Sequence, residues 1–223
     1  MGAESLDDHL ADLLTHLEPD CVLDVGANVG QFGEIVRRAG YHGWIVSFEP
    51  CAEPFELLAE RAGQDGRWRA LRIALGDADG ARPMKVATSS LFSSFRPPSE
   101  YSLRRTPDES PVVREEHVEV RRLDSCWETC LTGIRAERVF LKVDTQGFDL
   151  DVVRGAGAKL DRVCGLQVEG SFRHLYDGVP HCLDTLEYLR GRGFEPTGIF
   201  PVIRDSMLRL IEVDCVLVRA DGD

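Results

Sequence analysis

Short apolar runs and amphipathic segments alternate along this chain of 223 residues, and this alternation restricts its fold more than any other feature. The apolar runs "CVLDVG", "GWIVSFEP" and "WRALRIALGD" are separated by the helical patterns "GQFGEIVRRAG" and "AEPFELLAERAG". A strand that returns to the same sheet after a helix runs parallel to the first strand, through a right-handed crossover. The alternation therefore predicts a parallel sheet with helices packed against it.

The same rhythm returns in the second half of the chain. Four more strands are expected, at "RVFLKVDTQG", "VCGLQVEG", "FEPTGIFPVI" and "LIEVDCVLVRA". Only a short turn near "RDSM" joins the last two, so they should form an antiparallel hairpin. We therefore predict an α/β fold: a Rossmann-like, seven-stranded, mostly parallel sheet with helices on both faces and an antiparallel last strand.

The predicted organisation is one domain with a helix before it and an insertion within it. Residues 1–20 read as an N-terminal helix, because leucines recur at helical spacing after Ser5. Residues 21–223 should form the domain, with a loop insertion at about 81–121. Possible strands at 82–87 and 117–121 flank a stretch rich in Ser, Pro and Arg. Long irregular loops in compact domains are often functional covers, so residues 88–112 are expected to cover a site.

The charge balance disfavours one class of partner. The formal net charge is −12, whereas binding to nucleic acid needs a basic face. No apolar run approaches the roughly 18 residues of a membrane span, and the N-terminus does not read as a secretory signal. The seven cysteines contain no CxxC pair and are expected to be reduced thiols in a cytoplasmic protein. The oligomeric state stays open, with a homo-oligomer among the alternatives.

Glycines end the most strand-like segment, "VLDVGANVGQF" at residues 22–32. Glycine lets the backbone approach a ligand closely, and parallel sheets bind ligands at the carboxyl ends of their strands. The next strand ends at Glu49, 23 positions after Gly26. A carboxylate near that spacing is placed to accept both hydroxyls of a ribose. The ligand is therefore expected to carry an adenosine-like ribose.

The residues of this loop distinguish between two kinds of adenosine ligand. Dinucleotide sites use GxGxxG, whereas this loop reads D-x-G-x-N-x-G, with Asp24 before the first glycine. A carboxylate there would repel a pyrophosphate and suit a cationic amine. S-adenosylmethionine (SAM) has an amine, a carboxylate, a ribose and no phosphate, so SAM is favoured over NAD. A glycine turn that serves only helix–strand packing is the alternative interpretation.

Six motifs occur in a characteristic order: "VLDVGANVGQF", "SFEP", "IALGD", "SSLFSSF", "LKVDTQGFDLDVVRGA" and "IEVDCVLVR". Together they cover about residues 20–220 and resemble those of the FkbM-type methyltransferases. The resemblance implies a class I, SAM-dependent O-methyltransferase that acts on hydroxyls of sugars, polyketides and other small molecules. This sequence departs from the family pattern at Gln146, where Glu is more usual, and at Asp149, which keeps the charge.

The resemblance also implies a cofactor site, residue by residue. Its expected members are Asp24, Gly26, Ala27, Asn28, Gly30, Gln31, Glu49, Pro50, Ala74 and Leu75. The loop residues should surround the methionine half of SAM. Glu49 should bind the ribose with Pro50 beside it, and Ala74 and Leu75 should flank the adenine.

Polar residues at the ends of two later strands are the catalytic candidates. Lys142 and Asp144 share one face of a strand by period-two alternation, Glu169 ends the next strand, and His174 follows it. A hydroxyl acceptor has to lose a proton. Asp144 could take it, orient the hydroxyl or contact the cofactor, and His174 is the alternative base. Lys142 with Asp144 also reads as a structural ion pair. A divalent cation on Asp144, Glu169 and His174 is a further alternative, but no metal is expected because no motif demands one.

We therefore expect a SAM-dependent O-methyltransferase of secondary metabolism. Its acceptor should be a hydroxylated small molecule: a saccharide, a glycosylated natural product or a glycolipid headgroup. Residues 88–112 should supply part of the acceptor pocket. Two other functions are weighed against this one: a methyltransferase-like protein that binds the cofactor without catalysis, and an NAD-dependent oxidoreductase, for which GxGxxG is missing.

Overall fold

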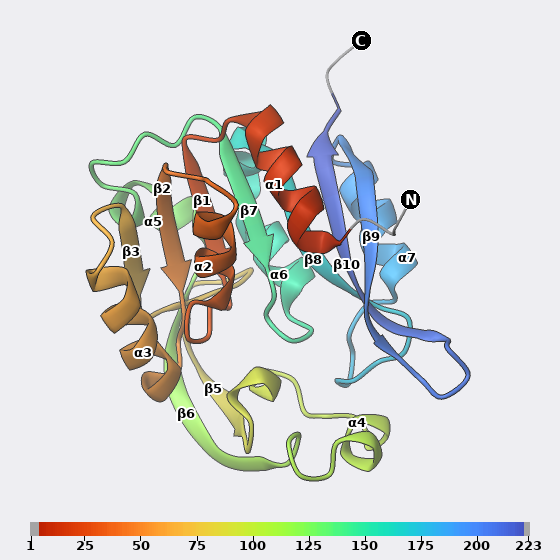
Figure 1. The fold of residues 1–223 in the computed structure, drawn as a ribbon. Helices are drawn as coiled ribbons and strands as arrows, with labels where there is room; N and C mark the ends of the chain where they lie inside the picture. The colour runs from red at the N-terminus through yellow and green to blue at the C-terminus, as the bar shows by residue number, and fades with distance from the viewer. Residues whose placement is uncertain (1–4, 221–223) are drawn as a thin grey trace.

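A seven-stranded sheet forms the centre of the computed structural model, which describes residues 5–220 (Figure 1). In spatial order its strands are β3 (Trp68–Leu71), β2 (Trp44–Phe48), β1 (Cys21–Val25), β7 (Val139–Val143), β8 (Val163–Ser171), β10 (Leu210–Arg219) and β9 (Phe194–Arg204). The first five run parallel, and β10 is antiparallel to both of its neighbours. The predicted sheet, with its antiparallel last strand, is confirmed.

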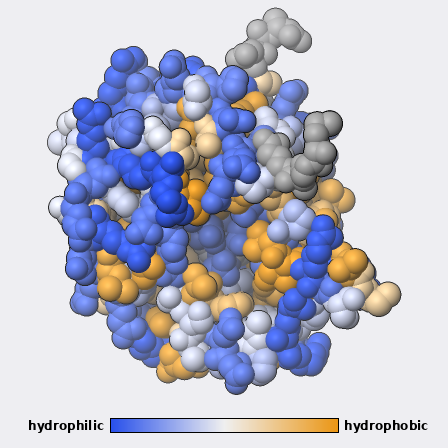
Figure 2. All heavy atoms as spheres, viewed as in Figure 1, coloured by the Kyte–Doolittle hydropathy of each residue, from blue (hydrophilic) through white to orange (hydrophobic). Residues whose placement is uncertain are grey.

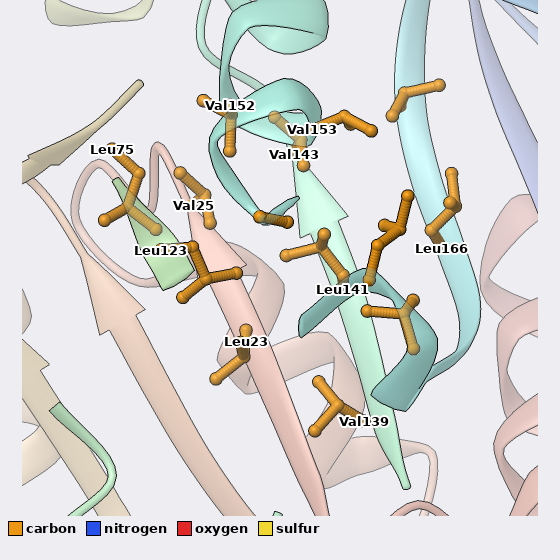
Figure 3. Close-up of a cluster of buried hydrophobic side chains, with 14 of the residues drawn as sticks. Leu23, Val25, Leu75, Leu123, Val139, Leu141, Val143, Val152, Val153 and Leu166 are labelled. Atoms are coloured by element: carbon orange, nitrogen blue, oxygen red, sulfur yellow. The ribbon is translucent and has the colours of Figure 1, made fainter. Parts of the chain in front are cut away.

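Helices cover both faces of this sheet. On one face lie α1 (Leu6–Leu17), α2 (Gln31–Arg38) and α3 (Ala52–Gly63), and on the other lie α5 (Leu123–Cys130), α6 (Asp149–Gly155) and α7 (Cys182–Arg190). The alternation of side chains along β1 explains the two cores. Val22 packs with α1–α3, whereas Leu23 and Val25 pack with the opposite layer, where Leu141 and Val152 join them (Figure 3). A 3-10 turn, η2 (Gly157–Arg162), follows α6.

The third predicted strand is divided into two, which corrects the expectation of one strand at residues 68–77. The last residue pair between β2 and β3 joins Phe48 to Leu71. Because β2 ends there, the chain beyond Leu71 has no strand of the main sheet to pair with. Three residues later β4 (Ala74–Leu75) begins, and it pairs with β6 (Val112–Arg121) in a separate sheet.

Residues 80–121 form an arm rather than an irregular loop. It contains β5 (Gly80–Ala87), the 3-10 turn η1 (Ser90–Phe92), α4 (Glu100–Arg105) and β6. The two flanking strands are longer than expected and pair with each other antiparallel. In Figure 1 the arm lies below the carboxyl ends of β1, β2 and β7, which is where a parallel sheet binds its ligands.

The surface is mostly hydrophilic, with apolar side chains gathered beside the β9–β10 hairpin (Figure 2). Met207 and Leu208, in the turn of that hairpin, are exposed. All seven cysteines are free thiols, and six of them are buried. Within residues 5–220, none of the helices has the length and apolar character needed to cross a bilayer.

Candidate active site

A cavity of about 300 Å³ lies at the carboxyl ends of the parallel strands, a volume in the range of small-molecule sites. Its walls come from three parts of the molecule. The main sheet and the segments after its strands contribute Val25, Gly26, Asn28, Phe48, Glu49, Pro50, Asp144, Thr145, Gln146, Glu169 and Glu212. The arm and β4 contribute Ala74, Leu75, Met84, Ser90, Leu91, Phe92, Ser93 and Phe95, and β9 contributes Val202 and Ile203.

The structure brings most of the expected site residues together, but not all of them. Those that line the cavity are Gly26, Asn28, Glu49, Pro50, Ala74, Leu75, Asp144 and Glu169. Those that do not line it are Asp24, Ala27, Gly30, Gln31, Lys142 and His174.

The two glycines of the first loop have different functions. Gly26 has a φ of 75°, and a Cβ on it would lie 1.8 Å from the backbone oxygen of Asp144. It therefore allows the loop after β1 to touch the chain after β7. Gly30 precedes α2, and a Cβ on it would meet Leu58 and Trp68 at 3.1 Å. Helix packing, the alternative interpretation of the glycine pattern, therefore explains the glycine at position 30 but not the one at position 26.

Glu49 is held by two backbone amides at the end of β2. Its Oε2 accepts a hydrogen bond of 2.9 Å from the amide of Asn28, and its Oε1 one of 2.8 Å from the amide of Cys51. Burial raises the pKa of Glu49 to about 7, although these bonds oppose the shift. A carboxylate has about four acceptor positions, so the fixed side chain can still accept the two hydroxyls of a ribose.

Asp24 does not reach the cavity, contrary to the expectation that it faces an amine of the ligand. It is fully buried; its Oδ2 accepts from Ser47 Oγ at 3.0 Å, and its Oδ1 lies 3.2 Å from Lys142 Nζ. Strand register explains this, because Ser47 and Lys142 are the residues paired with Asp24 on the two neighbouring strands. The carboxylate is therefore held inside the sheet layer by one hydrogen bond at Oδ2 and by the ion pair at Oδ1.

Lys142 is the buried cation of this layer and lies beneath the cavity. Its Nζ is also 3.4 Å from Asp144 Oδ2 and donates to the backbone oxygen of Gly26 at 3.3 Å. Burial alone would lower the pKa of Lys142, but the carboxylates of Asp144 and Asp24 outweigh burial and raise it. The lysine is therefore charged, and it joins the strand that carries Asp24 to the strand that precedes Asp144.

Gln146 bridges the two acids that end β7 and β8. Its Nε2 donates to Asp144 Oδ1 at 3.0 Å and to Glu169 Oε2 at 3.1 Å, and its Oε1 accepts from the hydroxyl of Tyr176 at 2.8 Å. The glutamate more usual at this position would offer no such donors, because an ionised carboxylate only accepts. Gln146, where the sequence departs from the family pattern, is thus a residue of the site that hydrogen-bonds to both acids.

Glu212 is an acid of the site that sequence reasoning missed. It lies on β10 opposite Ser171, whose Oγ donates to its Oε1 at 3.3 Å. The available signal was the pair of acids, Glu212 and Asp214, within the otherwise apolar run "LIEVDCVLV". Glu169 and Glu212 line both the main cavity and a smaller one of about 10 Å³, which Asp149 also lines.

Burial and mutual repulsion raise the pKa values of these acids. Burial raises the pKa of Glu169 well above its ordinary value, and the nearby charges of Asp144 and Glu212 add to the shift. Burial likewise raises the pKa of Glu212 to about 7 and, with Asp144, that of Asp149 to about 7. This end of the cavity can therefore take up or release protons near neutral pH.

His174 is not part of this cluster, which corrects its place among the catalytic candidates. It is exposed and contacts the arm through its backbone oxygen, which accepts from Ser99 Oγ at 2.8 Å. Among residues 5–220, no three side chains of His, Cys, Asp or Glu are grouped as a metal site. The geometry thus gives no support to a cation held by Asp144, Glu169 and His174.

The arm contacts both loops that carry the site. The side-chain amide of Asn28 donates to Ser90 Oγ at 3.1 Å, and Ser94 Oγ donates to the backbone oxygen of Gln146 at 2.7 Å. Arg96 donates to the backbone oxygen of Gly147 and pairs with Asp151, each at 2.8 Å. These bonds hold the arm across the cavity, between the loops that follow β1 and β7.

Comparisons with known proteins agree with this geometry. The model of the methyltransferase FkbM domain matches residues 24–196. The 2-O-methyltransferase NoeI of Sinorhizobium fredii (strain NBRC 101917 / NGR234) is 28% identical in an alignment of length 214, which covers 90% of this chain and 83% of NoeI.

Two solved methyltransferases share the fold. An rRNA methylase from Streptococcus thermophilus matches with a TM-score of 0.51 at 10% identity, over 99% of this chain and 100% of that chain. A magnesium protoporphyrin IX methyltransferase from Synechocystis PCC 6803, solved with bound SAM, also has a TM-score of 0.51, at 9% identity, over 96% of this chain and 78% of that chain. At such identities these two structures support the fold alone.

Proposed function

This chain belongs to the FkbM methyltransferase family, and on that premise we propose that it methylates a hydroxyl of a sugar, a glycosylated natural product or a glycolipid headgroup. It is a SAM-dependent methyltransferase. One observation carries the proposal: a single cavity joins the carboxylate of Glu49 to the wall of Asp144, Gln146 and Glu169. The activity in the name of NoeI, 2-O-methylation, supports oxygen as the target.

Different parts of the cavity fit the chemically different parts of SAM. Glu49 offers acceptors for the ribose hydroxyls, and Gly26 lines the cavity beside it. Phe48 and Leu75, both lining the cavity, supply an apolar surface for the adenine. When bound, SAM supplies an electrophilic methyl group on a positively charged sulfur.

The residues of this chain align the acceptor and receive its proton. In the proposed reaction the acceptor oxygen forms a bond to the methyl carbon, the carbon–sulfur bond breaks, and the hydroxyl proton leaves. Alignment of two reactants can contribute about 7–11 kcal/mol. We propose Glu169 as the proton acceptor, because it lines the cavity and continues into the acid cluster with Glu212 and Asp149. A positive charge bound in the cavity lowers the raised pKa of Glu169 and so favours its carboxylate form.

Transfer of a labelled methyl group tests this function. The protein is incubated with methyl-labelled SAM and neutral glycosides, each beside a matched glycoside in which an amine replaces one hydroxyl. We expect labelled methyl ethers from the hydroxyl series. Label found only on the amines would contradict O-methylation. Binding of S-adenosylhomocysteine (SAH) without transfer to any acceptor would favour the non-catalytic alternative, and binding of NAD without SAH would favour the oxidoreductase.

Glu49→Ala is expected to weaken SAH binding by about 1–3 kcal/mol, the usual loss for hydrogen bonds to a charged group. Titration calorimetry measures the change. Because the pKa of Glu49 is about 7, the affinity of the wild type should fall as pH drops below that value. Glu53→Ala is the control, since Glu53 is exposed on the first turn of α3 and pairs with Arg114 at 3.2 Å. Equal affinities of the two variants would remove Glu49 from the ribose site.

SAH is expected to slow proteolysis of the arm, because the arm bonds to both loops of the cofactor cavity. Trypsin can cut after Arg104 and Arg105, which are exposed at the end of α4. Cleavage after Arg190, exposed at the end of α7, serves as the internal control. The products are identified by mass spectrometry. If SAH leaves cleavage at Arg104 and Arg105 as fast as before, residues 88–112 do not act as a cover.

A further inference from the structure

We propose, resting on the function proposed above, that Asp144 binds the α-amino group of the methionine half of the cofactor. The sequence pattern predicts that Asp24 binds this amine, but the structure places Asp24 where it cannot reach the ligand. Asp24 is fully buried and engaged by Ser47 and Lys142. Other carboxylates line the cavity and are available to the positive charge, and Asp144 is one of them.

The charges under the cavity do not cancel. Lys142 is one cation between two carboxylates, with Asp24 Oδ1 at 3.2 Å and Asp144 Oδ2 at 3.4 Å from its Nζ. This group of three carries one uncompensated negative charge. Asp24 is closed off from solvent, whereas the side chain of Asp144 is 37% exposed and lines the cavity. The residual charge is therefore presented to the ligand at Asp144, where an ammonium group would neutralise it.

The position of Asp144 also matches the length of the ligand. Glu49 follows β2 and Asp144 follows β7, and these strands flank β1 on its two sides. Two strand spacings are roughly 10 Å, which the short carbon and sulfur chain between the ribose and the amine can span. Glu169 and Glu212 belong to β8 and β10, one and two strands further from Glu49. They are better placed to meet the acceptor.

The carboxylate of Asp144 is already held in place. The amide of Asp144 donates to the backbone oxygen of Val25 at 3.0 Å, and its backbone oxygen lies where a Cβ of Gly26 would be. Its Oδ1 accepts from Gln146 at 3.0 Å. Each oxygen has a further acceptor position, so the group is oriented beside the first loop and can still bind an ammonium. Asp144 is then a binding residue, and the proton of the acceptor is left to Glu169.

Calorimetric titration with two ligands tests this assignment. One ligand is SAH, and the other is its desamino analogue, in which hydrogen replaces only the α-amino group. In Asp144→Asn we expect about ten- to hundredfold weaker binding of SAH and the same affinity for the analogue within twofold. Asp144→Glu, which keeps the charge, should retain the preference for SAH. Glu53→Gln, which changes an exposed acid outside the cavity, should bind both ligands like the wild type.

An equal loss for both ligands in Asp144→Asn, or no loss for either, would overturn the assignment. The result is separable from the proposed function. A protein that shows the expected ligand difference but transfers its methyl group only to amines would disprove O-methylation and leave the role of Asp144 intact.

Discussion

Lys142→Met is expected to lower the free energy of unfolding by about 3–5 kcal/mol, the cost of breaking a buried ion pair by removing one partner. Methionine has a similar length, so the loss comes mainly from charge. Asp24 would stay fully buried with only Ser47 as a partner. Urea denaturation at neutral pH measures the change, and adding Asp24→Asn to the variant should recover part of it.

A second lysine gives the matched control. Lys159 Nζ lies 2.9 Å from Glu128 Oε1, but Glu128 is 86% exposed. Pairs exposed to solvent contribute about 1 kcal/mol or less, so Lys159→Met should change the free energy of unfolding little. If both variants lose the same small amount, Lys142 is not the buried counter-ion that the geometry describes.

The sheet could be predicted from sequence because its determinants are local. Alternation along β1 assigns Val22 and Leu23 to opposite faces, and each helix has its own apolar stripe. The break between β3 and β4 could not be predicted in this way. It depends on where β2 ends, since Leu71 is the last residue of β3 with a partner in the main sheet. No property of "WRALRIALGD" itself records the length of a neighbouring strand.

In the site, too, the directions and contacts of single side chains could not be predicted from the sequence. The motif places Asp24 correctly at the end of β1, but its direction depends on Lys142, a cross-strand neighbour 118 positions later. The bridge formed by Gln146 likewise needs Glu169 and Tyr176, which are close only in the folded chain. His174 is three residues beyond Ser171, where the pairing of β8 with β10 ends. The chain there turns outward to meet the arm at Ser99.

Glu169→Gln is expected to reduce turnover by about 10²–10⁴-fold, the usual contribution of general acid–base catalysis, with SAH affinity retained within about twofold. Glutamine keeps the size of the side chain and an oxygen that can accept from Gln146, as Glu169 Oε2 does at 3.1 Å. What it removes is the ability to take a proton. Turnover is measured with methyl-labelled SAM and whichever hydroxylated acceptor the glycoside panel identifies.

The pH dependence separates this role from a structural one. Burial and the charges of Asp144, Glu212, Asp149 and Asp214 raise the pKa of Glu169, and only its ionised form can act as a base. Turnover of the wild type should therefore rise with pH until this proton is lost, with apparent values that belong to the coupled acids together. Glu169→Gln should lack the part of this rise that is due to Glu169.

Two further variants decide between neighbouring candidates for the base. His174→Ala should keep wild-type turnover, because His174 is exposed and does not line the cavity. Glu212→Gln should cost less than Glu169→Gln, since Glu212 lies one strand further from the cofactor loop. If Glu212→Gln loses 10²-fold or more while Glu169→Gln stays within about threefold of the wild type, Glu212 is the base. That outcome would move the acceptor one strand along the sheet, toward Val202 and Ile203 of β9, which line the same cavity.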